Sequence, residues 1–274
     1  MYKYDTKKKL LQHDFQSVQA MLRYIENGSF NDNFFHRASE IGDYEFSLTE
    51  SYNEAHDLCK RGALPDEIEK ANEMIDELKQ TKIYTIPKRY SNFVGFAPNV
   101  PAYLQGNPKN MYDIRKEKRK KIDVYYGAES SGRTSTDDIY LKGITTMGLI
   151  KLLEENGFNV NLKFFAALEN GKQRFLTRLL LKEEKERLDI ASSFVPMCHP
   201  AFSRRIVPRL LEITPDADQM WQKSYGLTCS EYTSRYLLDA KENDILINDL
   251  ASAKEWFKNI TEGEASEQLR EGGI

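Results

Sequence analysis

Residues 121–182 constrain the fold of this chain more than any other stretch. From Ile122 to Tyr126 the residues alternate as in a strand that buries one face more than the other. A loop rich in Ser, Thr and Asp follows, and then an apolar stripe at helical spacing that closes at Gly157. Period-two alternation returns, and the turn Asn170-Gly171 leads into another apolar run. The block predicts a strand, a helix and two further strands joined as a hairpin.

The rest of the chain predicts a second parallel strand and several helices. Residues 244–249 indicate a short buried strand that ends in acids or amides, and a helix is expected from about 252 to 260. Helical spacing or capping residues predict three more helices, over 14–27, 51–62 and 65–80.

These elements suggest three regions. Four prolines between residues 86 and 111 indicate an ordered but irregular strap. We therefore expect a helical N-terminal region with the Pro-rich strap over 1–112, an α/β domain over 113–262, and a loosely held tail over 263–274.

Composition favours a folded protein inside the cell. The 274 residues are 40% hydrophobic, which supplies the apolar surface that a disordered chain lacks. Three widely spaced cysteines suit reduced thiols, and no run of about 18 apolar residues occurs. The net charge of -3 gives no global attraction to nucleic acid. We expect a cytoplasmic protein with no membrane partner.

The central block resembles the opening of the von Willebrand factor A fold. In that family a D-x-S-x-S loop and an Asp at the end of the fourth strand, with a Thr from a later loop, hold a magnesium ion that ligates a partner's carboxylate. The matching positions here are Glu129, Ser131, Arg133 and Asp249, so Glu and Arg replace the first Asp and the last Ser. The resemblance implies a Rossmann-type α/β sheet with one antiparallel hairpin strand. It also implies magnesium held by Glu129, Ser131 and Asp249.

Two further stretches resemble an uncharacterised domain family found mainly in bacteriophage genomes. They are Ser51-Tyr-Asn-Glu-Ala and Gly95-Phe-Ala-Pro-Asn-Val-Pro101. With the central block, the resemblance spans about residues 48–230. It implies a viral origin, action in the host cytoplasm or association with the virion, and no known activity.

The loop after the first strand of the block is the best candidate site. It lies where a sheet strand ends and a helix begins, a place that presents small hydroxyls and unpaired N–H groups. The candidate binding face consists of Glu129, Ser130, Ser131, Arg133, Ser135 and Asp249. In the alternative interpretation, Ser135 only caps the helix and Arg133 pairs with Glu129.

A cationic run before the strand is a second candidate. Arg115, Lys118, Arg119, Lys120 and Lys121, with tyrosines on either side, have the chemistry for phosphate contacts and base stacking. A solvated connector is the competing interpretation.

The sequence gives less support to zinc binding or enzymatic catalysis. His56, Cys59, Cys198 and His199 make a zinc site arithmetically conceivable, but adjacent residues rarely chelate one ion together. No G-x-G-x-x-G, Walker A or H-E-x-x-H motif occurs, so an enzyme is disfavoured. The sequence therefore predicts a non-catalytic, phage-encoded binding or assembly module with a viral or host protein partner. The alternatives are a nucleic-acid-binding protein and a metal-dependent hydrolase.

Overall fold

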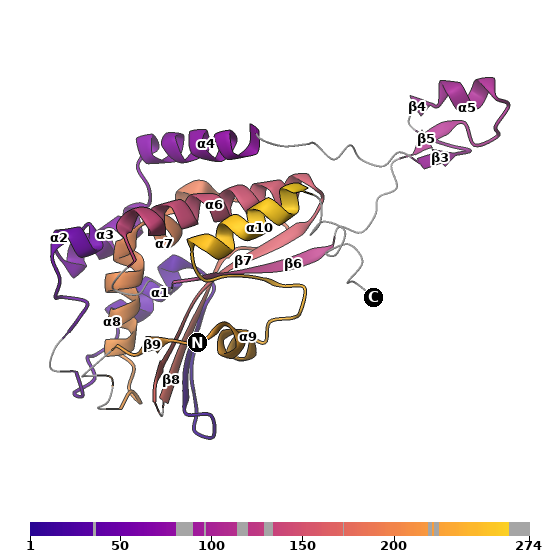
Figure 1. Cartoon of the computed structure of the whole chain (residues 1–274). Helices are drawn as coiled ribbons and strands as arrows, with labels where there is room; N and C mark the ends of the chain where they lie inside the picture. The colour runs from indigo at the N-terminus through magenta and orange to yellow at the C-terminus, as the bar shows by residue number, and fades with distance from the viewer. Residues whose placement is uncertain are drawn as a thin grey trace.

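The computed structural model is an α/β structure built on a mixed sheet of seven strands (Figure 1). Six of them lie in the order β1-β2-β8-β7-β6-β10, and β9 pairs with β7. The structure describes residues 1–34, 37–80, 90–95, 97–113, 120–128, 134–171, 173–218, 221 and 225–262. The expected tail, 263–274, lies outside them.

The central block is confirmed. Strand β6 (Lys121–Gly127) leads through helix α6 (Thr136–Glu155) to β7 (Asn159–Asn170) and β8 (Gln173–Lys182). Strands β6 and β7 are parallel, and β7 and β8 form an antiparallel hairpin. The later strand is confirmed too: β10 (Ile245–Ile247) pairs in parallel with β6 and feeds helix α10 (Leu250–Glu262).

The N-terminus contributes two strands that helical spacing did not predict. Strand β1 (Tyr2–Asp5) pairs antiparallel with β2 (Leu10–Phe15), and β2 joins the sheet in parallel beside β8. The expected helix over 14–27 begins later, as α1 (Val18–Glu26), because the Ser17 hydroxyl accepts from the Ala20 N–H and caps it there.

The next two expected helices are present. Helix α2 (Tyr44–Ser47) precedes α3 (Tyr52–Arg61) and α4 (Pro65–Gln80). Ser51 caps α3, because its hydroxyl accepts from the Glu54 N–H; the Glu54 carboxylate accepts from the N–H of Glu50, one residue before the cap.

A small separate sheet replaces the expected irregular strap. Strands β3 (Tyr90–Asn92) and β4 (Ala97–Pro98) both pair antiparallel with β5 (Met111–Asp113), and the short helix α5 (Val100–Leu104) links β4 to β5.

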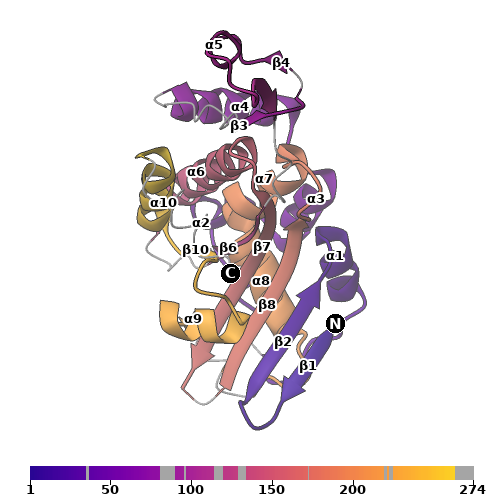
Figure 2. The same ribbon diagram turned by 90° about the vertical axis from the view of Figure 1, so that its right-hand side faces the viewer.

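Most helices lie on one face of the main sheet (Figure 2). The chain after β8 forms α7 (Ile190–Cys198), the π-helix η1 (Phe202–Ile206), α8 (Val207–Glu212), β9 (Leu227–Thr228) and α9 (Glu231–Leu238). Alternate residues of the strands pack against α1, α6, α7, α8 and α10 in the larger core. The other face packs against α9 through Leu237 and Leu238.

Helices α6 and α7 approach closely at one glycine. A Cβ on Gly143 would lie 2.4 Å from the Cys198 Sγ and 2.7 Å from the Met197 carbonyl oxygen. Only glycine therefore allows this contact, which holds α7 against α6 near the carboxyl ends of β6 and β10. Separately, none of the helices in the described ranges combines the length and apolar character needed to cross a bilayer.

Candidate functional site

Two helices begin at the same edge of the sheet. Because β6 and β10 are parallel, their carboxyl ends lie together, and α6 and α10 start beside them. The Ser135 hydroxyl accepts from the Asp138 N–H at 3.0 Å, and an Asp249 carboxylate oxygen accepts from the Ser252 N–H at 2.7 Å. Both predicted site residues thus cap helices at this edge.

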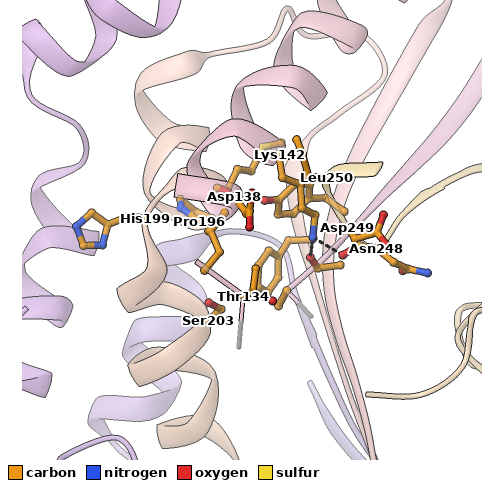
Figure 3. A pocket seen from close by; sticks show the side chains of 15 residues that line it. Thr134, Asp138, Lys142, Pro196, His199, Ser203, Asn248, Asp249 and Leu250 are labelled. Carbon is orange, nitrogen blue, oxygen red and sulfur yellow. Dashed lines mark hydrogen bonds between the residues drawn. The ribbon is translucent and has the colours of Figure 1, made fainter. Parts of the chain in front are cut away.

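A buried lysine ties the two strand ends together. Lys142, on α6, donates from its Nζ to the Gly127 carbonyl oxygen and, at 2.7 Å, to the Asn248 carbonyl oxygen (Figure 3). Its ammonium lies 4.3 Å from the centre of the Tyr126 ring. Only 6% of Lys142 is exposed, so the charge is held in place under the edge.

A cavity of about 50 Å³ opens over this lysine. It has room for a few water molecules, because one water needs roughly 10–15 Å³. Polar groups from four elements or their flanking loops line it: Thr134, Asp138, Lys142, His199, Ser203 and Asp249. We call Thr134, Ser135, Asp138 and Asp249, with this cavity, the strand-end face.

Helix α7 and the π-helix η1 form the wall of the cavity opposite β6 and β10. The Tyr126 hydroxyl donates to the Met197 carbonyl oxygen at 2.5 Å, which joins β6 to α7. The buried Arg204 donates to the Thr134 carbonyl oxygen at 2.6 Å and to the Phe46 carbonyl oxygen. The described groups around the cavity are therefore held in position by hydrogen bonds.

The carboxylate of Asp249 is ionised at neutral pH. Hydrogen bonds from the Ser252 N–H, and more weakly the nearby Lys142 ammonium, hold the pKa of Asp249 below its usual range. Asp249 and Asp138 are exposed, so the rim of the strand-end face is acidic although the charge beneath it is positive.

The histidine at this site is neutral. Burial lowers the pKa of His199 to about 4, and its Nδ1 accepts from the Ala201 N–H at 3.2 Å. In Figure 3 its ring lies apart from the other labelled side chains. This geometry suits a structural role better than proton transfer at the cavity.

Two of the three cysteines are equally unsuited to nucleophilic chemistry. Cys59 and Cys198 are buried, and burial raises the pKa of Cys59 to about 12 and that of Cys198 well above its usual value. Both therefore stay protonated, whereas a nucleophilic cysteine needs a thiolate.

Four of the six predicted face residues fall outside the described part of the chain. These are Glu129, Ser130, Ser131 and Arg133, which leaves Ser135 and Asp249 at the edge. Of the magnesium set, only Asp249 is described, and one of its oxygens already accepts from the Ser252 N–H. Across the described ranges, no three His, Cys, Asp or Glu side chains come together to hold a metal ion. Magnesium binding by Glu129, Ser131 and Asp249 therefore stays a prediction, and we assign no metal-dependent step.

The cationic run is only partly described. Arg115, Lys118 and Arg119 lie outside the described residues, and Lys120 is half-buried. The Lys121 ammonium lies 3.0 Å from a Glu184 carboxylate oxygen, a surface ion pair worth roughly 0–1 kcal/mol.

Sequence reasoning missed Lys142 and Arg204. A signal existed for the first, because Lys142 lies inside the buried stretch of α6 between Ile139 and Met147, where a lysine needs hydrogen-bond partners. For Arg204 no local pattern indicates burial, since its partners come from distant segments.

Fold and site together define an α/β protein with a mixed sheet, in which a buried lysine joins two strand ends. The chain belongs to the family described as "Domain of unknown function (DUF7192)", whose model matches residues 3–273. Comparison with the curated proteins and with the solved structures found no match.

Proposed function

We propose that this protein is a non-catalytic protein-binding or assembly module and that its partner docks on the strand-end face. The observation that carries the proposal is the Lys142 contact, which joins the ends of β6 and β10 to α6 beneath an open cavity. A binding face gains affinity when it is rigid before the partner arrives, because less conformational entropy is lost on association.

The chemistry of the rim indicates the kind of partner. The exposed carboxylates of Asp138 and Asp249 and the hydroxyls of Thr134 and Ser135 can accept hydrogen bonds. Lys or Arg side chains complement such a rim in charge and donate to it. The partner is therefore a protein that presents a basic segment.

The described side chains with reactive potential support a non-catalytic role. His199 is neutral with its Nδ1 already engaged, and the thiols of Cys59 and Cys198 stay protonated. Each has a packing or hydrogen-bonding role that accounts for its position.

We also propose that the protein is of bacteriophage origin and that it acts in the host cytoplasm or in the virion. The resemblance of residues 51–55 and 95–101 to a phage domain family supports both proposals. The strand order β8-β7-β6-β10, with an antiparallel hairpin strand, supports a von Willebrand A-like assignment for this part of the sheet.

Affinity capture tests the proposal. Tagged protein is incubated with lysate of the infected host, and bound proteins are quantified by mass spectrometry. Wild type is compared with Asp138→Lys, and with Asp66→Lys as the matched control, because both are exposed aspartates in the first turn of a helix. We expect a stoichiometric partner that Asp138→Lys loses and Asp66→Lys retains.

Two results would contradict the proposal. One is equal retention of the partner by both variants, which would move binding away from the strand-end face. The other is turnover of a nucleotide or peptide by the purified protein, which would make it an enzyme; a metal-dependent hydrolase would further lose both activity and metal binding in Asp249→Ala.

A further inference from the structure

A groove of about 480 Å³ lies between the β1–β2 hairpin and helix α9. Lys3 and Leu10 of the strands line one side, Tyr236 and Leu237 of α9 line the other, and the turn of the hairpin, residues 6–8, lines its end. This turn lies at the lower end of the main sheet in Figure 2. Leu10 and Leu237 belong to the smaller core, so the two sides are packed together beneath the opening. We call this feature the hairpin groove.

The hairpin gives the groove a positive charge. Residues 3–9 include four lysines, all exposed, and one acid. That acid, Asp5, is also the one acid among the described residues that line the groove, and its carboxylate accepts from the N–H groups of Lys7 and Lys8, each at 3.0 Å. On α9 the exposed Glu231 already pairs with an arginine of the same helix at 3.0 Å. An occupant that complements the groove therefore carries negative charge.

The turn holds its lysines in a defined arrangement. The two N–H groups that donate to Asp5 form a turn closed by its side chain. Lys9 takes φ +49°, in the left-handed region, where a residue other than glycine costs roughly 1–2 kcal/mol. Glycine would be less strained there, so a lysine at this position points to a role for its charge beyond stability.

Two tyrosines of α9 add exposed rings beside these cations. Tyr232 and Tyr236 are one helical turn apart on the same face, and they are 84% and 59% exposed. The Lys8 ammonium lies 5.1 Å from the centre of the Tyr236 ring. Surfaces that bind single-stranded nucleic acid combine these two features, because bases stack on aromatic rings while nearby cations contact the phosphates.

We propose that the hairpin groove binds single-stranded nucleic acid. Bases stack on Tyr232 and Tyr236, and the ammonium groups of Lys3, Lys7 and Lys8 contact the phosphates. An acidic protein segment would match the charge of the groove, but it would not account for two exposed rings beside the lysines. The site is distinct from the strand-end face, whose rim is acidic, so it adds a second kind of partner to the protein proposed above.

Fluorescence anisotropy on the full chain tests the phosphate contacts, with a labelled oligothymidylate of about 20 nucleotides titrated over a series of salt concentrations. The double variant Lys7→Gln/Lys8→Gln should bind more weakly, and its plot of log affinity against log salt should be flatter by about 1.4, or roughly 0.7 for each lost contact. Lys185→Gln/Arg187→Gln is the matched control, because it removes two exposed cations from another loop. Its slope should equal that of wild type.

The same assay tests the stacking. Tyr236→Ala should weaken binding roughly 5- to 100-fold, the range for losing one stacked base, whereas Tyr236→Phe keeps the ring and retains binding. Tyr44→Ala is the control, since Tyr44 is a half-exposed tyrosine on α2. The replaced side chains are exposed, and circular dichroism checks that each variant is folded.

Four results would overturn the proposal. The first is no binding of the oligonucleotide at low salt, and the second is an unchanged salt slope in Lys7→Gln/Lys8→Gln. The third is binding by Tyr236→Leu as tight as that of wild type, because leucine cannot stack. The fourth is displacement of the oligonucleotide by polyglutamate at equal concentration of charge, which would assign the hairpin groove to an acidic protein segment.

Discussion

At the scale of single residues, Lys142 has the largest structural role at the candidate site. Its ammonium donates to two carbonyl oxygens at the ends of different strands, so its removal affects β6, β10 and α6 together. A buried donor with a full charge contributes more than a neutral one, because its hydrogen bonds are charge-assisted.

Lys142→Met should destabilise the protein by about 2–4 kcal/mol, since it removes two charge-assisted hydrogen bonds from a buried position. Urea unfolding followed by circular dichroism measures this. Lys151→Met is the control, because Lys151 lies on the same helix and its Nζ donates to the Asn72 side chain at 2.9 Å near the surface. Equal stability of the two variants would show that Lys142 does not hold the edge.

His13, which is buried, and His199, which is half-buried, should make stability depend on pH. Burial lowers the pKa of His13 to about 3 and that of His199 to about 4, against an ordinary value of 6.5. The unfolded chain therefore binds protons that the folded chain excludes. The stabilisation from these neutral rings is complete above about pH 6.5 and is lost as the pH falls towards 4 and 3.

We expect the free energy of unfolding to fall by about 1.4 kcal/mol per pH unit for each histidine between pH 6 and pH 4. His13→Phe keeps the aromatic contacts with Phe15 and Tyr24 and removes one titration, so the slope should be roughly halved. Urea unfolding across this pH range measures the slope. An unchanged slope in His13→Phe would show that His13 does not contribute to the pH dependence.

At the scale of elements, the π-helix η1 joins the N-terminal segment to the body. π-Helices are rare and occur mostly as single turns inside α-helices. Here consecutive arginines are both buried: Arg204 donates to the carbonyl oxygen of Thr134, and Arg205 donates to the hydroxyls of Ser47 and Thr49. Arg205 also donates to the carbonyl oxygens of Ser39, Gly42 and Thr49. The segment around α2 is thus held by five hydrogen bonds from Arg205 and by the bond from Arg204 to the Phe46 carbonyl oxygen.

Arg205→Met should release this segment, because five hydrogen bonds are lost and several polar groups are left without their donor. Hydrogen exchange of residues 39–50 should then become faster by at least tenfold, while the strands of the main sheet are less affected. Arg187→Met serves as the control at an exposed arginine. Unchanged protection of residues 39–50 in Arg205→Met would mean that other contacts hold them.

At the scale of the whole molecule, the sheet is built from both ends of the chain. Strand β2 pairs with β8 across more than 160 residues, and Leu11 is fully buried there. Met21 on α1 and Ile75 on α4 are also fully buried in the larger core. The division into an N-terminal region over 1–112 and an α/β domain over 113–262 stays a prediction.

We expect that residues 113–262 alone will not fold cooperatively, because the fragment would expose the apolar surface that β2, α1 and α4 cover. Residues 1–262 should fold as the full chain does. Thermal unfolding followed by circular dichroism distinguishes the two, and a sharp transition in the shorter fragment would support two independent domains.

Much of the candidate site could not have been predicted. The cap formed by Ser135 was expected from residues within one turn, whereas the Lys142 partners come from two separate strand ends. The exposure of Phe93 and Tyr103 was also unexpected, because an aromatic residue in a Pro-rich stretch looks the same whether it packs inward or faces solvent.

The sequence by itself determined the central strand-helix-hairpin block, the short strand that ends before Asn248 and the capped starts of α3 and α6. The spacing of apolar residues and the capping of a helix are local properties, because each depends on residues within a few positions of one another. Only the tertiary structure decided that β2 joins the sheet, that Lys142 lies beneath its edge and that Arg205 holds a distant segment. Those outcomes depend on which surfaces meet when residues far apart in the chain pack together, and no local pattern specifies that.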